Sequence, residues 1–261
     1  MELGLAGRRA MVLGGGGGLG SAIARALARE GAAVMVCDVD IDAADRTTQS
    51  IIDAGGQARS VALDLRAIGD SLDQADLGND VLGAIDILVN NSGGPPPGAA
   101  LDVKAETWRK HFEDMFVALT EITRRVLPGM IERRWGRVIN SASSGIVAPI
   151  PQLAVSNALR SALLGWSKSL AREAAPFGVT VNVIVPGRIA TQRIRQLDEA
   201  RASRERRTVD AVMAESVASI PAGRYGTPEE YADVATFLAS ERASYVTGSI
   251  VRVDGGYIPS V

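Results

Sequence analysis

The sequence predicts an α/β fold in which helices cover both faces of one parallel sheet. Three features favour it. Short apolar runs alternate with amphipathic segments along the 261 residues, five consecutive glycines follow the first apolar run, and Asp38 ends the second. Short apolar runs suit strands buried on both faces of a sheet, and alternation of strands with helices is typical of parallel sheets. We therefore expect a doubly wound, seven-stranded parallel sheet.

Each expected strand is closed by a turn signal or a helical segment. The strands are 9–13, 32–38, 58–63, 85–89, 136–141, 179–185 and 250–253. Helices are expected from the glycines to about residue 30, over 42–54, over 105–134 with a kink at Pro128-Gly129, over about 153–175, and from Thr227. Residues 67–82 form a weaker helical pattern, and 189–220 form a charged helical insertion. Because the chain shows no linker or internal repeat, we expect a single domain over 1–261.

The glycine run opens the first helix and suits a phosphate ligand. Glycine accepts positive φ and lets backbone N–H groups approach a ligand closely. The start of the helix adds partial positive charge, so the turn predicts a diphosphate site. Two glycine sets fit from spacing alone, Gly15, Gly17 and Gly20 or Gly14, Gly18 and Gly20.

Asp38 lies 18 residues after Gly20, at the end of the second expected strand. There a carboxylate can accept hydrogen bonds from the adenosine ribose of a dinucleotide. No Arg or Lys lies in the turn or directly after Asp38 to attract a 2′-phosphate, so we expect NAD rather than NADP as cofactor. The alternative is a structural glycine turn with Asp38 as a capping residue.

Composition excludes several classes of function. The net charge of −2 gives no general attraction to nucleic acid or a membrane surface. Cys37 and His111 are the only residues of their types, which excludes an intrachain disulfide, cysteine clusters and multi-histidine centres, so no metal is expected. No apolar run approaches the roughly 20 residues that span a bilayer, and residues 1–8 lack the apolar region of a signal peptide. We expect a cytoplasmic protein that binds neither nucleic acid nor membrane.

Motifs along nearly the whole chain carry a family resemblance. They are Gly14, Gly18 and Gly20, Asp64-Leu65, residues 86–93, Trp108, residues 167–173, Val181-Asn182, Pro186-Gly187 with Thr191, residues 224–226, Thr247-Gly248 and residues 254–256. With these motifs the chain resembles the classical branch of the short-chain dehydrogenase/reductase family, near its 3-oxoacyl-(acyl carrier protein) reductases. The resemblance implies a single-domain Rossmann fold and selects the glycine set Gly14, Gly18 and Gly20.

The resemblance also implies a place for each part of the cofactor. Residues 14–20, Leu19 included, would hold the diphosphate, and Asp38 the adenosine ribose. The remaining cofactor residues would be Asp64 and Leu65 at the adenine, Asn91 and Gly93 at the ribose region, and Pro186, Gly187, Ile189 and Thr191 towards the nicotinamide. Leu13 departs from the usual Thr, so one hydroxyl of the turn is missing. The insertion 189–220 would be a substrate lid, and the helices near 105–134 and 153–175 would pair subunits into a homotetramer or homodimer.

The catalytic positions depart further from the family, whose chemistry rests on an Asn, a Ser and a Y-x-x-x-K motif. Met115 stands at the Asn position, Ser143 keeps the Ser, Ser156 replaces the Tyr and Arg160 replaces the Lys. Ser156 and Arg160 still share one helix face because they are four residues apart. Arginine cannot exchange a proton near neutrality, and a serine hydroxyl is a far weaker acid than a phenol.

The resemblance implies an oxidoreductase that moves a hydride between nicotinamide and the carbonyl or alcohol carbon of a small molecule. Ser143 would bind the substrate oxygen, Arg160 would hold the ribose, and Ser156 or an ordered water would relay the proton. Two alternatives remain, a nucleotide-binding protein without redox turnover and a non-redox enzyme for elimination or isomerisation.

Three sets of charged residues lie outside this assignment. We expect His111 to be a packing or interface residue, and Arg188 to face either solvent or an anionic substrate. The cluster from Arg193 to Arg207 is interleaved with acidic residues, so a solvated lid helix is expected there.

Overall fold

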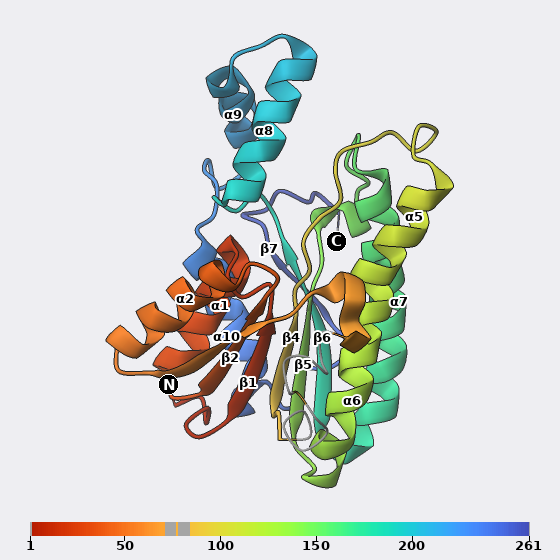
Figure 1. The fold of residues 1–261 in the computed structure, drawn as a ribbon. Coiled ribbons are helices and arrows are strands. Elements are labelled where there is room, and N and C mark those ends of the chain that lie inside the picture. The colour runs from red at the N-terminus through yellow and green to blue at the C-terminus, as the bar shows by residue number, and fades with distance from the viewer. Residues whose placement is uncertain (1, 71–76, 78–83, 261) are drawn as a thin grey trace.

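The protein is described by a computed structural model that covers residues 2–70, 77 and 84–260 (Figure 1). Within these residues seven parallel strands form one sheet in the order β3-β2-β1-β4-β5-β6-β7. The strands are β1 (Arg9–Leu13), β2 (Ala33–Asp38), β3 (Gln57–Ala62), β4 (Ile87–Asn90), β5 (Gly136–Ser141), β6 (Val179–Pro186) and β7 (Ile250–Val253). The order runs outwards from β1 to β3 and then restarts beside β1 at β4. This reversal confirms the predicted doubly wound sheet.

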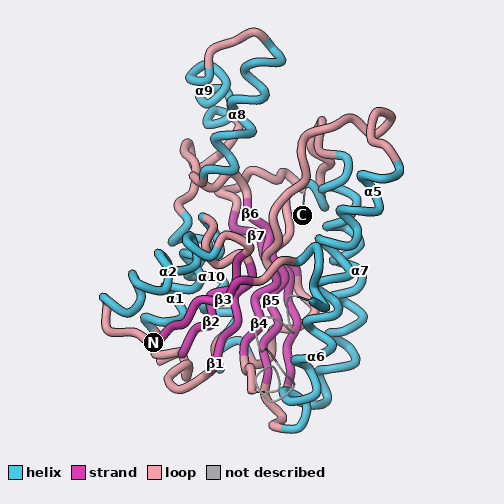
Figure 2. Tube along the Cα trace, viewed as in Figure 1, coloured by secondary structure: helices cyan, strands magenta, loops and turns pink. Residues whose placement is uncertain are grey.

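Helices cover both faces of the sheet, as Figures 1 and 2 show. One face carries α1 (Gly18–Arg29), α2 (Ile41–Asp53) and α10 (Pro228–Ala239), and the other carries α5 (Ala105–Phe112), α6 (Ala118–Glu132) and α7 (Ala154–Ala174). Short 3-10 turns occur at Leu65–Ala67, Ser144–Ile146, Ala175–Phe177 and Glu241–Ala243. None of the described helices is both long and apolar enough to cross a bilayer. Much of the weaker helical pattern over 67–82 lies outside the described residues.

Each face of the sheet has its own apolar core, because successive side chains of a strand point to opposite faces. Ala10 and Val12 of β1 pack with α1 and α10, whereas Met11 and Leu13 pack with α6 and α7. Full burial of Val12 and Leu13 on opposite faces explains why β1 reads as a continuous apolar run rather than an alternating one.

The long helix expected over 105–134 is interrupted, although not where the sequence predicts. α6 continues through Pro128 as far as Glu132, with the proline inside the helix. The regular α geometry is lost instead at a π-helical turn, Glu113–Val117, between α5 and α6. Such turns insert one extra residue into a helix and occur frequently at functional sites. Met115 lies in this turn.

The charged insertion forms two helices, α8 (Gln192–Glu205) and α9 (Val209–Ala218). They project beyond the carboxyl ends of the strands, away from the body of the sheet (Figure 1). Arg206 ends α8 with a φ of 53°, which turns the chain towards α9.

Candidate active site

The predicted site residues gather at the carboxyl ends of the strands. The loops that follow β1, β4, β5 and β6 supply Gly14, Asn91, Ser143 and Gly187 respectively. Open α/β sheets bind ligands at this edge, where the strand order reverses between β1 and β4.

The glycine loop after β1 is packed so closely that several of its positions exclude a side chain. A Cβ atom on Gly20 would lie 2.0 Å from the carbonyl oxygen of Gly14, and one on Gly18 would lie 2.8 Å from Cγ2 of Thr191. Gly14 itself has a φ of +59°, a conformation that favours glycine. A Cβ atom on Gly17 would meet nothing closer than 3.6 Å. A Cβ atom on Gly15 or Gly16 would also lie only 2.7 Å from a neighbouring side chain, so Gly17 alone among these glycines has room for one. This favours the set Gly14, Gly18 and Gly20, which does not include Gly17.

Asp38 fixes this loop from the end of β2. Its Oδ2 accepts a hydrogen bond from the Gly16 N–H at 2.9 Å, and its Oδ1 accepts one from the Asp40 N–H at 3.1 Å. No side chain caps the start of α1. A helix start without a side-chain cap fits a diphosphate, because the N–H groups of its first turn and the helix dipole attract negative charge.

The other expected cofactor residues lie around this loop. Nδ2 of Asn91 donates to the carbonyl oxygens of Leu13 and Gly14 at 3.3 and 3.4 Å, which ties the loop after β4 to the glycine loop. A Cβ atom on Gly93 would meet nothing within 4 Å, so space is open there. At the end of β3, Asp64 pairs with Arg66 at 2.6 Å, and this hydrogen bond lowers the pKa of Asp64.

The segment after β6 contacts both β7 and the glycine loop. Pro186 ends β6, and the Gly187 N–H donates to the carbonyl oxygen of Val253 at 2.9 Å. Ile189 is buried, and Thr191 caps α8 through its hydroxyl while its Cγ2 faces Gly18.

Ser143 begins the short turn after β5 with its hydroxyl oriented by the backbone. Its Oγ accepts a hydrogen bond from the Gly145 N–H at 3.2 Å. Because a hydroxyl both donates and accepts, the O–H of Ser143 stays available as a donor.

Ser156 and Arg160 lie one turn apart on α7, and both are buried. Arg160 Nη1 donates to the carbonyl oxygen of Ser141 at 2.8 Å, and Nη2 donates to those of Ser92 and Gly93 at 3.1 and 3.5 Å. Burial lowers the pKa of Arg160 to about 10, so the side chain remains a cation near neutral pH. The hydroxyl of Ser156 makes no hydrogen bond with any described residue.

Met115 meets α7 through an apolar contact. It is buried in a cluster with Val155 and Leu159, against which Val103 and Trp108 pack. Val155 and Leu159 directly precede Ser156 and Arg160 in the chain, so the thioether lies next to the helix that carries the candidate site. A thioether is only a weak hydrogen-bond acceptor.

Arg188 is half-buried and paired, which corrects the expectation that it faces solvent. Its Nη2 donates to Oδ1 of the buried Asp198 at 2.7 Å and to Oγ of Ser216 at 2.9 Å. Tyr225 donates to the other oxygen of Asp198 at 2.8 Å. This network joins the end of β6 to α8 and α9. His111 pairs with Asp114 at 3.7 Å within the α5 region.

Arg193 departs from the solvated cluster in which the sequence placed it. Its Nη2 donates to the carbonyl oxygen of Pro95 at 2.7 Å, and its side chain is half-buried. Burial lowers the pKa of Arg193. Sequence reasoning missed this residue, because nothing in the local pattern of α8 indicates a contact with a loop so far away in the chain.

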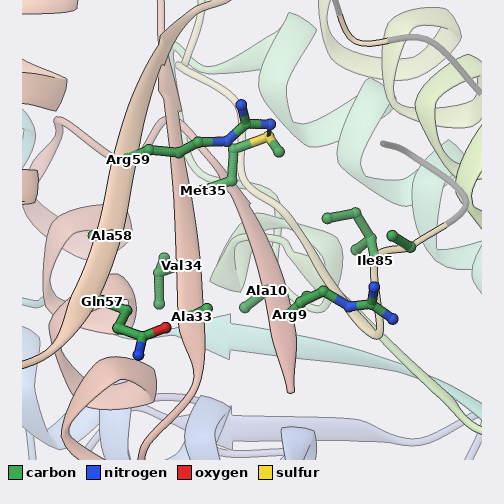
Figure 3. Close-up of a pocket in the computed structure, with 10 residues that line it drawn as sticks. Arg9, Ala10, Ala33, Val34, Met35, Gln57, Ala58, Arg59 and Ile85 are labelled. Carbon is green, nitrogen blue, oxygen red and sulfur yellow. Dashed lines mark hydrogen bonds between the residues drawn. The ribbon is translucent and has the colours of Figure 1, made fainter. Parts of the chain in front are cut away.

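A separate apolar hollow lies near the amino ends of β1, β2 and β3, at the opposite end of these strands from the candidate site (Figure 3). It is lined by residues that include Arg9, Ala33 and Gln57, the first residues of β1, β2 and β3. None of the predicted site residues lines it, so it is not the candidate site.

A doubly wound parallel sheet with a glycine loop at its switch point is the architecture of dinucleotide-binding α/β proteins. The chain belongs to the short-chain dehydrogenase/reductase family. The family model described as enoyl-(acyl carrier protein) reductase matches residues 15–258. This membership confirms the family to which the sequence motifs pointed.

Curated relatives share almost the full length of the chain. A 3-oxoacyl-(acyl-carrier-protein) reductase of Vibrio cholerae is 34% identical over 261 residues, covering 97% of this chain and 98% of the relative. A D-beta-hydroxybutyrate dehydrogenase of Cupriavidus necator is 35% identical over 259 residues, covering 97% of this chain and 99% of the relative.

Solved structures show the same fold. L-sorbose reductase from Gluconobacter frateurii, complexed with NADPH and L-sorbose, has a TM-score of 0.92 at 30% identity and covers 100% of both chains. An NADPH-dependent reductase of bacilysin biosynthesis has a TM-score of 0.92 at 28% identity, covering 98% of this chain and 100% of its own. Both neighbours are described with NADPH, so they do not support the preference for NAD that was expected from Asp38.

Proposed function

We propose that the protein is an NAD(P)-dependent oxidoreductase that moves a hydride between nicotinamide and the carbonyl or alcohol carbon of a small molecule, with a non-standard catalytic set. One observation carries the proposal. The Arg160 guanidinium is held at the carboxyl ends of β4 and β5, in a fold whose glycine loop leaves the start of α1 uncapped. Family membership over residues 15–258 supports the same reaction class.

The residues of the glycine loop fit a dinucleotide and would hold its diphosphate, with the adenosine ribose at Asp38. Asp64 and Leu65 would border the adenine, and Asn91 and Gly93 the ribose region. Pro186, Gly187, Ile189 and Thr191 would surround the nicotinamide. When bound, the cofactor supplies or accepts the hydride. The Asp38 carboxylate favours NAD because it would repel a 2′-phosphate, whereas the neighbours described with NADPH favour NADP at least as strongly.

Ser143 would orient the substrate. Its hydroxyl oxygen already accepts a hydrogen bond from the Gly145 N–H, so its own proton can be donated to a substrate oxygen. Arg160 would add positive potential near that oxygen, where negative charge develops during carbonyl reduction. The guanidinium group of Arg160 is held in place, since three backbone carbonyl oxygens accept its hydrogen bonds.

Ser156 would relay the proton. Its hydroxyl has no partner among the described residues, and it lies one turn of α7 before Arg160. Serine is too weak an acid to replace a phenol, so the proton would pass through it or an ordered water from solvent. General acid catalysis typically contributes about 10²- to 10⁴-fold in rate, so slow turnover of ordinary ketones is expected.

The apolar setting of Met115 favours one alternative function. Met115 would stand where the family has an Asn. Its buried thioether cannot hold a chain of water molecules as an amide can, which suits a dinucleotide-binding protein without redox turnover. A non-redox elimination or isomerisation on the same scaffold is the third candidate. We further propose that α8 and α9 form the substrate lid.

One experiment separates the three functions. Purified protein is incubated with each cofactor and a panel of ketones and alcohols, while the absorbance of reduced nicotinamide and the loss of substrate are both followed. Coupled changes support the oxidoreductase. Loss of substrate without a change in the cofactor supports non-redox chemistry, and cofactor binding without either change supports the non-enzymatic protein.

A further inference from the structure

Two arginines from different helices converge on the loop after β4. Arg160 on α7 reaches Ser92 and Gly93 of this loop, as described above. Arg193 on α8 reaches Pro95, and a Cβ atom on Gly94 would lie only 3.1 Å from its Nη2. The loop is therefore bordered by one guanidinium from the body of the protein and one from the proposed lid.

Neither guanidinium has an acidic partner among the described residues. The other arginines of α8 behave differently, because Arg195 pairs with Glu199 and both Arg201 and Arg204 pair with Glu205. The side chains of those pairs are between 29% and 78% exposed. Arg193, half-buried, contacts only a backbone carbonyl, and Arg160 is fully enclosed and contacts only carbonyls.

The positive charges of Arg160 and Arg193 are therefore not balanced by any acidic side chain among the described residues. Arg160 donates to Gly93 and Arg193 donates to Pro95, so both cations border the same short loop. Burial lowers the pKa of both arginines, and the charge of Arg193 also lowers the pKa of Arg160. Burial of charge without a partner is costly, whereas an oxyanion bound at Arg193 would offset the desolvation of that side chain and weaken the repulsion between the two guanidinium groups. Arg193 donates through Nη2 alone, which leaves Nε and Nη1 with no protein partner in the described structure.

The position of Arg193 points to the substrate rather than to the dinucleotide. Thr191 touches Gly18 of the glycine loop, and two residues later Arg193 touches the loop after β4. Residues 191–193 therefore bridge the two loops between which the nicotinamide and the reacting carbon would lie. An anion bound by Arg193 would sit on the lid side of that space.

We propose that the substrate is an oxyanion, foremost a carboxylate, whose negative group is bound by Arg193 and whose reacting oxygen lies towards Ser143 and Arg160. This inference rests on the proposed function and names the class of its substrate. A planar fork suits the two oxygens of a carboxylate, so the side chain acts as a determinant of specificity.

The test measures binding, so it does not depend on turnover. Calorimetric titrations with the cofactor present use 4-oxopentanoate, acetoacetate and malonate, with methyl 4-oxopentanoate as the uncharged match and inorganic phosphate as the alternative oxyanion. We expect Arg193→Gln to weaken carboxylate binding by about 10- to 100-fold, the range of a lost charged hydrogen bond. The matched control is Arg195→Gln on the exposed side of the same helix, which should leave binding unchanged.

Each result is decisive. Arg193-dependent binding of any carboxylate supports the proposal, and Arg193-dependent binding of phosphate alone supports the oxyanion site while assigning it to a phosphoryl group. Failure of all four anions to bind, or equal weakening of the methyl ester, overturns it. Weaker binding of the cofactor by Arg193→Gln without any anion would overturn it as well. Because ligand binding is read separately, an absence of hydride transfer would reject the proposed function while the anion site could still stand.

Discussion

The Arg160 guanidinium spans the carbonyl oxygens of Ser141 and Ser92, at 2.8 and 3.1 Å, and so joins the ends of β5 and β4. A lysine ammonium is a single point of charge and cannot reproduce a planar fork that serves two carbonyls. We propose that Arg160 takes the place of the family's Lys, and this replacement changes the geometry of the cation at this position.

The first prediction concerns Ser156 and Arg160. We expect Arg160→Lys alone to lower native carbonyl-reducing activity by about 10-fold or more, because at least one charged hydrogen bond is lost. Ser156→Tyr with Arg160→Lys should gain nothing on simple ketones. Steady-state rates on a ketone panel with NADH and NADPH compare wild type, both single variants and the double variant. Arg172→Lys on the exposed end of α7 is the control. A double variant faster than wild type on any ketone would show a decayed reductase instead of a specialised site.

The second prediction concerns the choice of cofactor at Asp38. We expect both NADH and NADPH to bind, and Asp38→Ala to weaken NADH by about 10-fold through the loss of charged hydrogen bonds to the ribose. Fluorescence titration of the reduced nicotinamide measures both constants. Asp42→Ala in the first turn of α2 keeps the loop intact and should change neither. An unchanged affinity for NADH in Asp38→Ala would remove Asp38 from the ribose site.

The third prediction concerns pH and the only cysteine. Burial raises the pKa of Cys37 to about 12 from an ordinary value near 9. The unfolded chain therefore loses this proton first as pH rises, so the contribution of Cys37 to stability is complete below about pH 9 and is lost between about pH 9 and 12. Urea unfolding across this range should show the decline, and Cys37→Ala should lessen its slope. Thiol labelling that proceeds in the native state at pH 8 would contradict the burial on which this rests.

The fourth prediction concerns the Arg188–Asp198 pair beneath the proposed lid. We expect Asp198→Asn to loosen α8 and α9, because it leaves Arg188 with a weaker partner in a buried setting, and breaking such pairs costs about 3–5 kcal/mol. Hydrogen exchange should rise across 192–218 and not in the sheet. Glu199→Gln, which breaks only the exposed pair with Arg195, should leave exchange unchanged. Exchange that stays at the wild-type rate in Asp198→Asn would mean that the pair does not hold the lid.

The fifth prediction concerns assembly. Phe112 is 40% exposed on α5 and stacks on Phe116, which in turn meets Trp166 on α7, so an aromatic surface joins these helices. We expect light scattering at micromolar concentration to give a dimer or tetramer of the 27.3 kDa chain. Phe112→Glu should lower the mass, whereas Phe177→Glu, on an exposed turn elsewhere, should not. A wild-type mass of one chain would reject the prediction.

The sequence allowed the fold and the cofactor loop to be predicted because their determinants are local. The parallel sheet follows from the alternation of strands and helices, and the crowding of Gly18 and Gly20 reflects spacing that can be read from the chain. The role of Arg193 could not be predicted in this way. Its contact is with Pro95, 98 positions away, and the charges around it on α8 resemble those of any solvated helix.

Two errors have physical causes of the same kind. Proline usually disturbs a helix, yet α6 passes through Pro128, and the π-helical turn at Met115 carries no sequence signal of its own. From the sequence, Arg188 beside the Pro-Gly turn was expected to face either solvent or an anionic substrate. Only the fold brings Asp198, on the next helix, into the buried pair that neutralises it.

The missing cap at the start of α1 has a consequence for the life of the protein in a cell. A dinucleotide bound there would hydrogen-bond the N–H groups that no side chain caps. Its concentration would therefore affect the stability of the folded protein as well as the rate of catalysis. A ligand present at a hundredfold excess over its Kd adds about 2.7 kcal/mol to folding stability. Depletion of the dinucleotide would then raise the fraction of unfolded chain that proteases can cleave, and the cellular amount of the protein would fall with the concentration of the dinucleotide.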